Sequence, residues 1–288
     1  MKLSTAIGRF DDQMRADGRS PITREVHVRD LRRLQEWLGS RATIEAVTPR
    51  VLTRYLNSDV FVFTKTGKPR TPVTVNRSKS AIRTFFRFLT DAGYLKANPA
   101  RLVKLARTPR KPPRPMSRED VKRLLAVIKK HKDPLARRDY LMFRLMLATG
   151  IRLGAAVGLD VSDLDCTAQT IRILTKGGLE QRVYLSPRLV RELRRYAKGT
   201  ALFQSCRGHR LTPRQVQGRF SQWLLSACIR ERYTVHSLRH TFATRLYEQT
   251  RDIRLVQRAL GHARVTTTEV YTLIDDTAVH RAVGKLKL

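Results

Sequence analysis

The segment TVHSLRHTFATRL, residues 234–246, places two histidines and an arginine within five positions. The apolar residues of the segment recur at helical spacing and predict an amphipathic helix, with Leu238, Phe242 and Leu246 on one stripe. His236 and Arg239 are three positions apart, so they share a face of this helix one turn apart. Three interpretations arise: a solvated basic face, a metal site built on His236 and His240, and a site that grips a phosphate.

The metal interpretation has weak support in the sequence. The zinc motif H-E-x-x-H needs a glutamate directly after the first histidine, and Ser237 stands there. The chain has three cysteines without C-x-x-C spacing, namely Cys166, Cys206 and Cys228. An odd number at such spacing indicates reduced thiols in a cytosolic protein, and a zinc site that adds His209 is the disfavoured alternative. We expect no bound metal.

The charge of the chain favours a polyanionic partner. Its 58 Lys and Arg residues against 24 Asp and Glu residues give a net charge of +34 over 288 residues. Such a charge opposes compaction unless a polyanion neutralises it, and nucleic acid is the leading candidate. An anionic membrane surface is second, because the basic residues are spread throughout and no long apolar segment occurs. The first residues, MKLSTAIGRF, lack an apolar leader, so we expect a cytoplasmic, nucleoid-associated protein.

A proline-rich stretch divides the chain. RTPRKPPRP, residues 107–115, combines four prolines with four basic residues and is incompatible with a helix or a central strand. We therefore expect a helical domain over residues 1–107, an extended linker over residues 108–115 and a second domain over residues 116–288. The linker charge, including Arg110 and Lys111, suits it to lie along DNA phosphates.

The first domain reads as helices with basic outer faces. Ser20 and Pro21 predict the start of a helix that Gly39 ends, with Val28, Leu31, Leu34 and Leu38 on its apolar stripe. A second helix has apolar Ala81, Ile82, Phe85, Phe86 and Leu89, and Gly93 interrupts it. Its opposite faces carry Arg77, Lys79, Arg83 and Arg87. We expect these four to contact a DNA backbone, and an ordinary solvated face is the alternative.

The second domain is predicted to be mostly helical with one hairpin. Ser117 followed by Asp120 resembles a capping box before VKRLLAVI. DYLMFRLMLATG is apolar nearly all round, which predicts a buried helix ending at Gly150, directly before Ile151 and Arg152. QTIRILTKGGLEQRVYLSP has two β-rich runs around two glycines, a hairpin pattern with Lys176 at or beside the turn. Helices resume from Pro187.

Five motifs now stand in order along the chain: ATGIRLGAAVGL, TKGG, HSLRHTFAT, ALGH and TTTEVYT. Together they resemble the tyrosine recombinase (phage integrase) family, and AIRTFFRFLTDAGYLKANPA is similar to the core-binding domain of its small Xer-like members. The resemblance covers about Ser20 to Thr272. It implies a mainly α fold with a small β-sheet: an α-helical, SAM-like core-binding domain followed by an α+β catalytic domain, which together would encircle duplex DNA.

The resemblance also implies an active site and a reaction. The matching catalytic positions are Arg152, Lys176, His236, Arg239, His262 and Tyr271. In that family a tyrosine attacks a DNA phosphodiester and forms a 3′-phosphotyrosine, and a free 5′-hydroxyl then joins the new strand. No cofactor is required. The implied partners are double-stranded DNA with short inverted repeats and a homotetramer, or two related recombinases, on that DNA.

The residue chemistry supports this reading independently. Guanidinium groups are always charged and fork onto phosphate oxygens, which suits Arg152 and Arg239 to developing negative charge. Histidines at 236 and 262 can donate hydrogen bonds or move protons near neutral pH. Lys176 can protonate the leaving 5′ oxygen. Tyr271 has an ordinary pKa near 10 and needs cations nearby to become a nucleophile.

Each position also has an ordinary structural interpretation. A lone arginine after a buried helix or a lysine at a turn is commonly solvated, His262 could cap a helix, and Tyr271 could be a core aromatic. Four further tyrosines of the second domain are rival nucleophiles: Tyr184, Tyr196, Tyr233 and Tyr247. His240 is expected to be structural or to support His236.

One position departs from the family pattern. The family usually has an acidic residue three positions after the first arginine, and Ala155 stands there. Such an acid braces the catalytic cations, so its loss puts the positioning of Arg152 or His236 in question. Asp160 or Asp163 could substitute.

Three other functions stay open on the sequence. A type IB topoisomerase would share the chemistry without a defined site, a DNA-binding protein without enzymatic activity would not need Tyr271, and a cleavage-deficient relative would fit Ala155. The end of the chain, DTAVHRAVGKLKL, has the pattern of a short amphipathic helix that docks on a neighbouring protomer or packs on its own domain.

Overall fold

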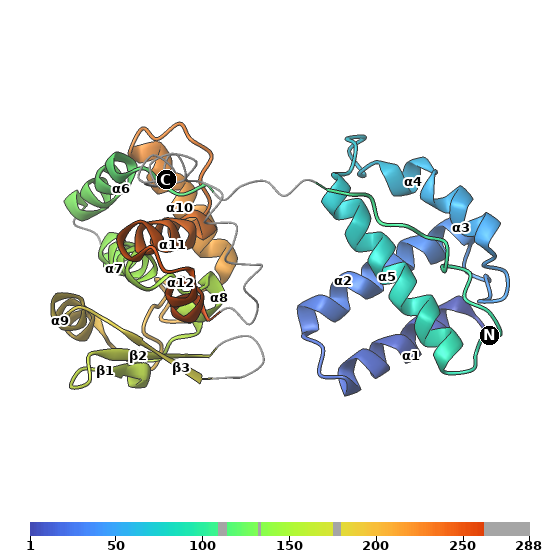
Figure 1. Ribbon diagram of the computed structural model, residues 1–288, viewed down its shortest axis with the longest axis horizontal. Helices are drawn as coiled ribbons and strands as arrows, with labels where there is room; N and C mark the ends of the chain where they lie inside the picture. The colour runs from blue at the N-terminus through green and yellow to red at the C-terminus, as the bar shows by residue number, and fades with distance from the viewer. Residues whose placement is uncertain (109–113, 132–133, 175–179, 262–288) are drawn as a thin grey trace, which may run out of the picture. The chain divides into compact units, whose positions relative to one another are not determined.

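The computed structural model describes residues 1–108, 114–131, 134–174 and 180–261. The chain divides into two compact units, Met1–Arg110 and Lys111–Leu288 (Figure 1). Each unit has its own hydrophobic core.

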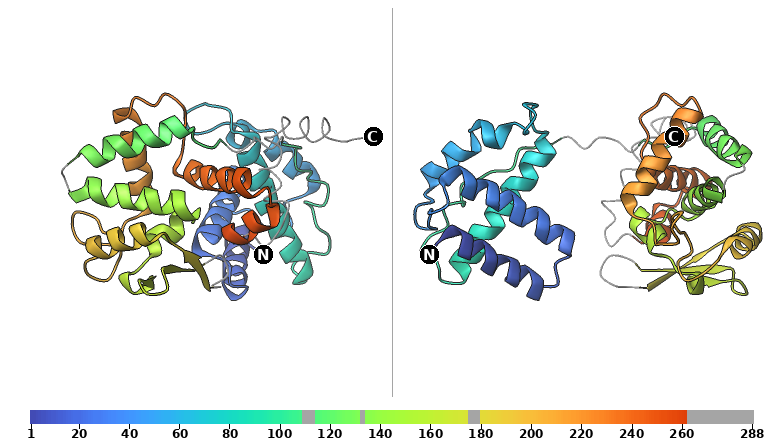
Figure 2. Two further views of the ribbon diagram at one scale, coloured as in Figure 1. Left: turned by 60° about the vertical axis from the view of Figure 1, so that its left-hand side comes forward. Right: turned by 180° about the vertical axis from the view of Figure 1, so that it is seen from behind.

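The first unit is helical in its described part. Its elements are α1 (Leu3–Ala16), α2 (Pro21–Leu38), α3 (Pro49–Leu56), α4 (Asp59–Val62) and α5 (Pro72–Asp91). The long helices α1, α2 and α5 pack against one another, and Figures 1 and 2 show α5 crossing the other two. Aromatic rings fill the core between them: Phe10, Tyr55, Phe61, Phe85 and Phe86 are all almost fully buried.

The two helices predicted for this unit are confirmed, with their end signals. The Ser20 hydroxyl accepts a hydrogen bond from the Thr23 N–H at the start of α2, and Gly39 ends the helix with φ 99°. The five apolar residues predicted along α5 are all fully buried. Helix α1 was not anticipated, although its buried Leu3, Ile7, Phe10 and Met14 recur at helical spacing.

Helices also dominate the second unit. They are α6 (Arg118–Lys130), α7 (Pro134–Thr149), α8 (Leu153–Gly158), the 3₁₀ turn η1 (Val161–Asp163), α9 (Pro187–Tyr196), α10 (Pro213–Ser226), α11 (Val235–Thr250) and α12 (Ile253–Leu260). Helix α7 is central, because it contacts α6, α8, α9 and α11. Its Leu141, Met142, Phe143, Leu145 and Met146 are buried, as its apolar sequence predicts. The Ser117 hydroxyl caps α6, whereas the Asp120 carboxylate accepts from Arg123 and Tyr233.

The sheet has three antiparallel strands in the order β1 (Leu164–Asp165), β2 (Thr170–Leu174) and β3 (Glu180–Tyr184). The predicted hairpin is confirmed by the β2–β3 register, in which Leu174 pairs with Glu180 and Thr170 with Tyr184. Ile171 and Ile173 point into the core. The two-residue strand β1 was not predicted. The turn of the hairpin, with Lys176, lies outside the described residues.

The predicted fold class is confirmed: a mainly α protein with one small antiparallel sheet. Within the described ranges, no helix combines the length and the apolar character that crossing a bilayer requires.

Candidate active site

Arg239, on α11, is 97% buried and is held by the ends of two other helices. Its Nη1 donates to the Gly150 carbonyl directly after α7 at 2.5 Å, and its Nη2 donates to the Leu260 carbonyl at the end of α12 at 2.8 Å. The C-terminal end of a helix carries partial negative charge, so two such ends stabilise a buried guanidinium. The interpretation of Arg239 as part of a solvated basic face is therefore wrong.

Glycines end both of the helices that hold Arg239. Gly150 and Gly261 have φ of 65° and 61°, in the left-handed region that favours glycine. At Gly150 the packing also requires glycine, because a Cβ there would overlap the Phe242 ring and lie 2.9 Å from Leu260 Cδ2. The reversal at Gly150 turns the chain so that Arg152 becomes the N-cap residue of α8.

Arg152 and Arg239 line one cavity of about 310 Å³. Arg152 is exposed, whereas Arg239 is buried behind it. The remaining wall is formed by the ends of α7 and α12, the start of α8 and strands β2 and β3, with Thr149, Ile151, Gly154, Ala155, Ile173, Leu174, Gln181, Ala259 and Leu260. The structure thus brings two predicted phosphate-binding cations together at one hollow, where an anion would meet a fixed guanidinium and an adjustable one.

Ala155 lies in the wall of this cavity together with the two arginines. The two predicted substitutes are engaged elsewhere. Asp160 accepts from Arg210 at 2.5 Å, and Asp163 accepts from Arg172 at 2.9 Å and from the Asp160 N–H at 2.9 Å. The suggestion that either carboxylate braces Arg152 or His236 is therefore not supported, because η1 directs both toward other arginines.

His236 and His240 lie one turn apart on α11, with their rings edge to face. Their ring centroids are 4.5 Å apart and their planes meet at 83°. His236 is exposed, but partial burial of its ring, then Arg239 and Arg152, lower its pKa below the usual 6.5. Burial, followed by His236 and Arg239, lowers the pKa of His240 to about 4. Both rings are therefore neutral at pH 7, and neutral His236 can accept a proton.

The part of the chain that the structure describes contains no cluster of side chains suited to bind a metal ion. No three His, Cys, Asp or Glu side chains there come together as ligands. The two rings of His236 and His240 meet edge to face. Cys206 and Cys228 are exposed and Cys166 is partly buried, all as free thiols.

Five of the predicted site residues lie outside the described residues: Lys176, His262, Tyr271, Arg110 and Lys111. The rival tyrosines are described, and two are poorly suited to attack. Burial, then its hydrogen bond to Asp120, raises the pKa of Tyr233. Burial also raises the pKa of Tyr196. Tyr184 is 82% exposed on β3, and Tyr247 stacks on Arg251. A raised pKa disfavours the phenolate that attack requires.

The four basic residues predicted on α5 divide into two pairs. Arg83 and Arg87 are exposed. Arg77 forms an ion pair at 3.3 Å with Asp30, which is almost fully buried, and Lys79 donates to the Lys104 carbonyl at 3.3 Å. Arg77 and Lys79 thus also hold the first unit together, a role that the sequence did not indicate.

One residue at the cavity was missed. Gln181 of β3 lines the same hollow as both arginines, and its Nε2 donates to the carbonyls of Arg258 and Ala259 at 3.2 and 3.4 Å. Gln181 occupies a partly buried position of β3, and nothing in the sequence there predicts a contact with distant backbone carbonyls.

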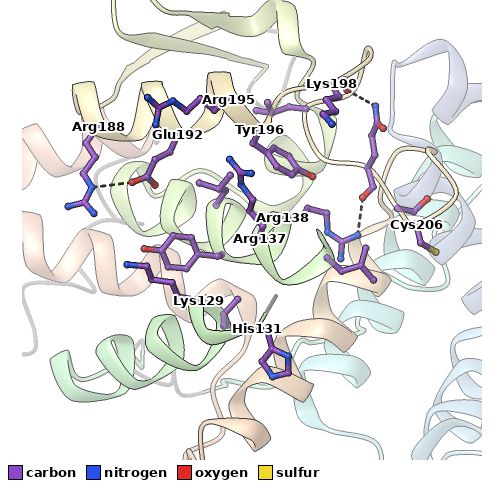
Figure 3. Close-up of a pocket in the computed structure, with 17 residues that line it drawn as sticks. Lys129, His131, Arg137, Arg138, Arg188, Glu192, Arg195, Tyr196, Lys198 and Cys206 are labelled. Carbon is purple, nitrogen blue, oxygen red and sulfur yellow. Dashed lines mark hydrogen bonds and ion pairs between the residues drawn. The ribbon is translucent and has the colours of Figure 1, made fainter. Parts of the chain in front are cut away.

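A larger cavity lies at the other end of α7. It measures about 830 Å³ and is bordered by α6, α7 and α9. Figure 3 shows Arg188, Glu192 and Arg195 of α9 on one side and Lys129 and His131 on the other. Its buried arginine, Arg138, is neutralised by Asp139 at 2.7 Å. This cavity is larger than the first, but none of the described catalytic candidates, Arg152, His236 and Arg239, lines it.

Comparison with known proteins agrees with this geometry. The model of the phage integrase family matches residues 114–277, and that of the phage integrase N-terminal SAM-like domain matches residues 7–93. The first match alone covers more than half of the chain. The chain therefore belongs to the phage integrase family and is a tyrosine-type site-specific DNA recombinase.

Its similarity to individual proteins is substantial. It is 37% identical over 212 residues to tyrosine recombinase XerC of Salmonella typhi, which spans 71% of this chain and 70% of that protein. The identity is also 37% over 204 residues with XerC of Escherichia coli O157:H7, 68% of each chain. The fold resembles XerH recombinase bound to palindromic difH, with a TM-score of 0.74, 23% identity and coverage of 94% and 81%. It equally resembles a lambda integrase dimer on a core site, with a TM-score of 0.74, 18% identity and coverage of 93% and 97%.

Proposed function

We propose that strand exchange by this recombinase is carried out by Arg152, Lys176, His236, Arg239, His262 and Tyr271. The Tyr271 oxygen attacks the scissile phosphorus, the bond from phosphorus to the 5′ oxygen breaks, and a 3′-phosphotyrosine forms. The tyrosine proton leaves to a base and the 5′ oxygen gains a proton. A free 5′-hydroxyl then reverses these steps and joins the new strand.

The observation that carries this proposal is the fixed position of Arg239 beside Arg152. A guanidinium bonded to two helix ends cannot swing away, so it meets the developing charge of the transition state without reorganisation. The exposed Arg152 completes a fork on the non-bridging oxygens. Preorganised donors of this kind stabilise the transition state more than the ground state.

His236 is proposed to accept the tyrosine proton. Its lowered pKa keeps the ring neutral at pH 7, which a base requires. The cations that lower this pKa, Arg239 and Arg152, are the ones that would hold the phosphate. Lys176 is proposed to protonate the leaving oxygen, and His262 to donate a hydrogen bond to the phosphate.

The two units are proposed to act as a clamp on duplex DNA, with residues 1–107 as the core-binding domain, residues 108–115 as the linker and residues 116–288 as the catalytic domain. Exposed Arg83 and Arg87, together with Arg77, Lys79, Arg110 and Lys111, would contact phosphates. The related XerH was solved on palindromic difH and lambda integrase as a tetramer on a Holliday junction. These relatives support inverted-repeat sites and a tetramer on DNA. We further propose that the protein acts in the cytoplasm, at the nucleoid.

The experiment is a suicide-substrate assay that traps the covalent protein–DNA adduct. We expect Tyr271→Phe to bind the site and form no adduct, because only the attacking oxygen is lost. Tyr184→Phe, Tyr196→Phe and Tyr233→Phe serve as controls and should form it normally. An adduct that persists in Tyr271→Phe would assign the nucleophile to another tyrosine, and a wild-type protein that binds without forming an adduct would be a cleavage-deficient relative.

A further inference from the structure

The last turn of α12 presents consecutive backbone carbonyls that have no i+4 N–H partner within the helix. Arg239 of α11 supplies one to Leu260 at 2.8 Å. Gln181 of β3 reaches the two preceding carbonyls: that of Ala259 at 3.4 Å, and that of Arg258 at 3.2 Å, which also accepts from the Gly261 N–H at 3.1 Å. Two side chains from two elements thus hold one helix end, and together they cover its last three carbonyls.

The position of Arg239 depends on this arrangement. Its guanidinium is fixed at two points, and one of them, the Leu260 carbonyl, moves with the end of α12. Gln181 ties that end to the sheet at the two preceding carbonyls. Without Gln181, the end of α12 would keep its apolar packing through Val256 and Leu260, but its carbonyls would lose their polar link to the sheet.

We propose that Gln181 is a positioning residue of the recombinase, which fixes the end of α12 and thereby aims the Arg239 guanidinium at the scissile phosphate. Gln181 lines the cavity with both arginines, so the link spans only the wall of that cavity. An amide suits the task, because its NH₂ group donates to two carbonyls at once, which a carboxylate cannot do. This inference rests on the proposed role of Arg239 in cleavage.

The test is a double-mutant cycle measured as the single-turnover rate of adduct formation. Gln181→Met removes the donor at nearly constant length, and we expect it to slow cleavage by about 10- to 100-fold, as small misplacements of catalytic groups do. In an Arg239→Ala background the same change should slow cleavage no further, because the group that it positions is gone. A scissile methylphosphonate is neutral before attack and develops less negative charge in the transition state, so it should likewise reduce the difference between Gln181→Met and wild type.

Gln204→Met is the matched control. The Gln204 amide also donates to two backbone carbonyls of the same unit, those of Lys198 at 2.9 Å and Ala201 at 3.2 Å, but at the distant basic cavity (Figure 3). It should leave the cleavage rate of each background unchanged, on both substrates. DNA binding and the thermal midpoint of each variant are measured in parallel.

Two results would overturn the inference. Gln181→Met could cleave normally, or it could slow cleavage by the same factor with and without Arg239 and on both substrates, which would make its role that of an ordinary structural contact. Failure of the proposed function looks different, because wild-type protein and the Gln204→Met control would then form no adduct either.

Discussion

Helix α7 has a cavity at each end, and the two differ in how they hold arginine. At its N-terminal end, the cavity of about 830 Å³ is wide and strongly basic, and buried Arg138 donates to the Asp139 carboxylate and the Gln204 carbonyl. At its C-terminal end, the cavity of about 310 Å³ has buried Arg239 on two helix-end carbonyls. The helical rise places Arg138 and Gly150 roughly 18 Å apart.

The two buried arginines, Arg138 and Arg239, differ in the groups that balance their charge. The Arg138 charge is balanced by a carboxylate that also accepts from Arg219 and Trp223, at 2.7 and 2.8 Å, so this cluster ties α7 to α10. The contacts of Arg239 with Gly150 and Leu260 are to carbonyl dipoles, which fix its geometry and contribute only partial negative charge. A buried cation held in that way still attracts an anion that enters the cavity beside it. The larger cavity is thus basic but structural, whereas the smaller one is arranged to bind an anion.

The largest expected effect separates the two buried arginines. Arg239→Ala should slow adduct formation by about 10²- to 10³-fold per folded molecule, the usual cost of losing one preorganised donor. Arg138→Ala should instead lower the free energy of unfolding by about 3–5 kcal/mol, because it breaks a buried ion pair. Folded Arg138→Ala protein should cleave at the wild-type rate. Suicide-substrate kinetics measure the cleavage rates, and urea unfolding measures the stabilities. Equal cleavage defects in Arg239→Ala and Arg138→Ala would contradict the proposed difference between the two arginines.

A smaller effect is expected at the glycine that ends α7. Gly150→Ala forces a side chain into the left-handed region and against Phe242, so it should cost about 2–5 kcal/mol of unfolding free energy. It should also slow cleavage, because the displaced carbonyl is a partner of Arg239. Gly218→Ala, inside α10 with open space around its Cβ position, should be neutral or stabilise by up to about 1 kcal/mol. Calorimetry measures the unfolding free energy of both variants. Equal stabilities of Gly150→Ala and Gly218→Ala would contradict the packing argument.

The smallest effect is expected at Ala155. Burial, Arg239 and Arg152 hold the His236 pKa below 6.5, so cleavage that needs the neutral ring should persist below pH 6.5 and fall as the ring becomes protonated. Ala155→Glu adds an anion to the cavity, favours protonated His236 and should move this acid limb upward by less than about one pH unit.

The control for that change lies at the other cavity. Lys198→Glu alters the charge by two units, but the site is more than a Debye length away, so the acid limb should stay in place. A pH–rate profile of single-turnover cleavage over the three proteins gives the comparison. An acid limb that moves downward in Ala155→Glu would show that the new carboxylate does not face His236.

Much of the local structure followed from the sequence. Ser20, Ser117 and the apolar stripes of α2, α5 and α7 predicted helices that the structure contains, because caps and periodicity act between residues a few positions apart. The hairpin followed from its two β-rich runs. Helix α1 was missed although its stripe is regular, and the two residues of β1 are too short to show a period.

The sequence by itself also determined the family, since five motifs in order are a pattern of residue types that needs no coordinates. Only the tertiary structure decided how Arg239 is held, because its partners lie 89 and 21 positions away along the chain. The same holds for Gln181, whose carbonyl partners are 77 and 78 positions away, and for Asp160 and Asp163, which pair with arginines away from the site. Backbone carbonyls have no side-chain identity, so contacts with them leave no mark in the residue types, and only the packing of α7, α11, α12 and β3 brings them together.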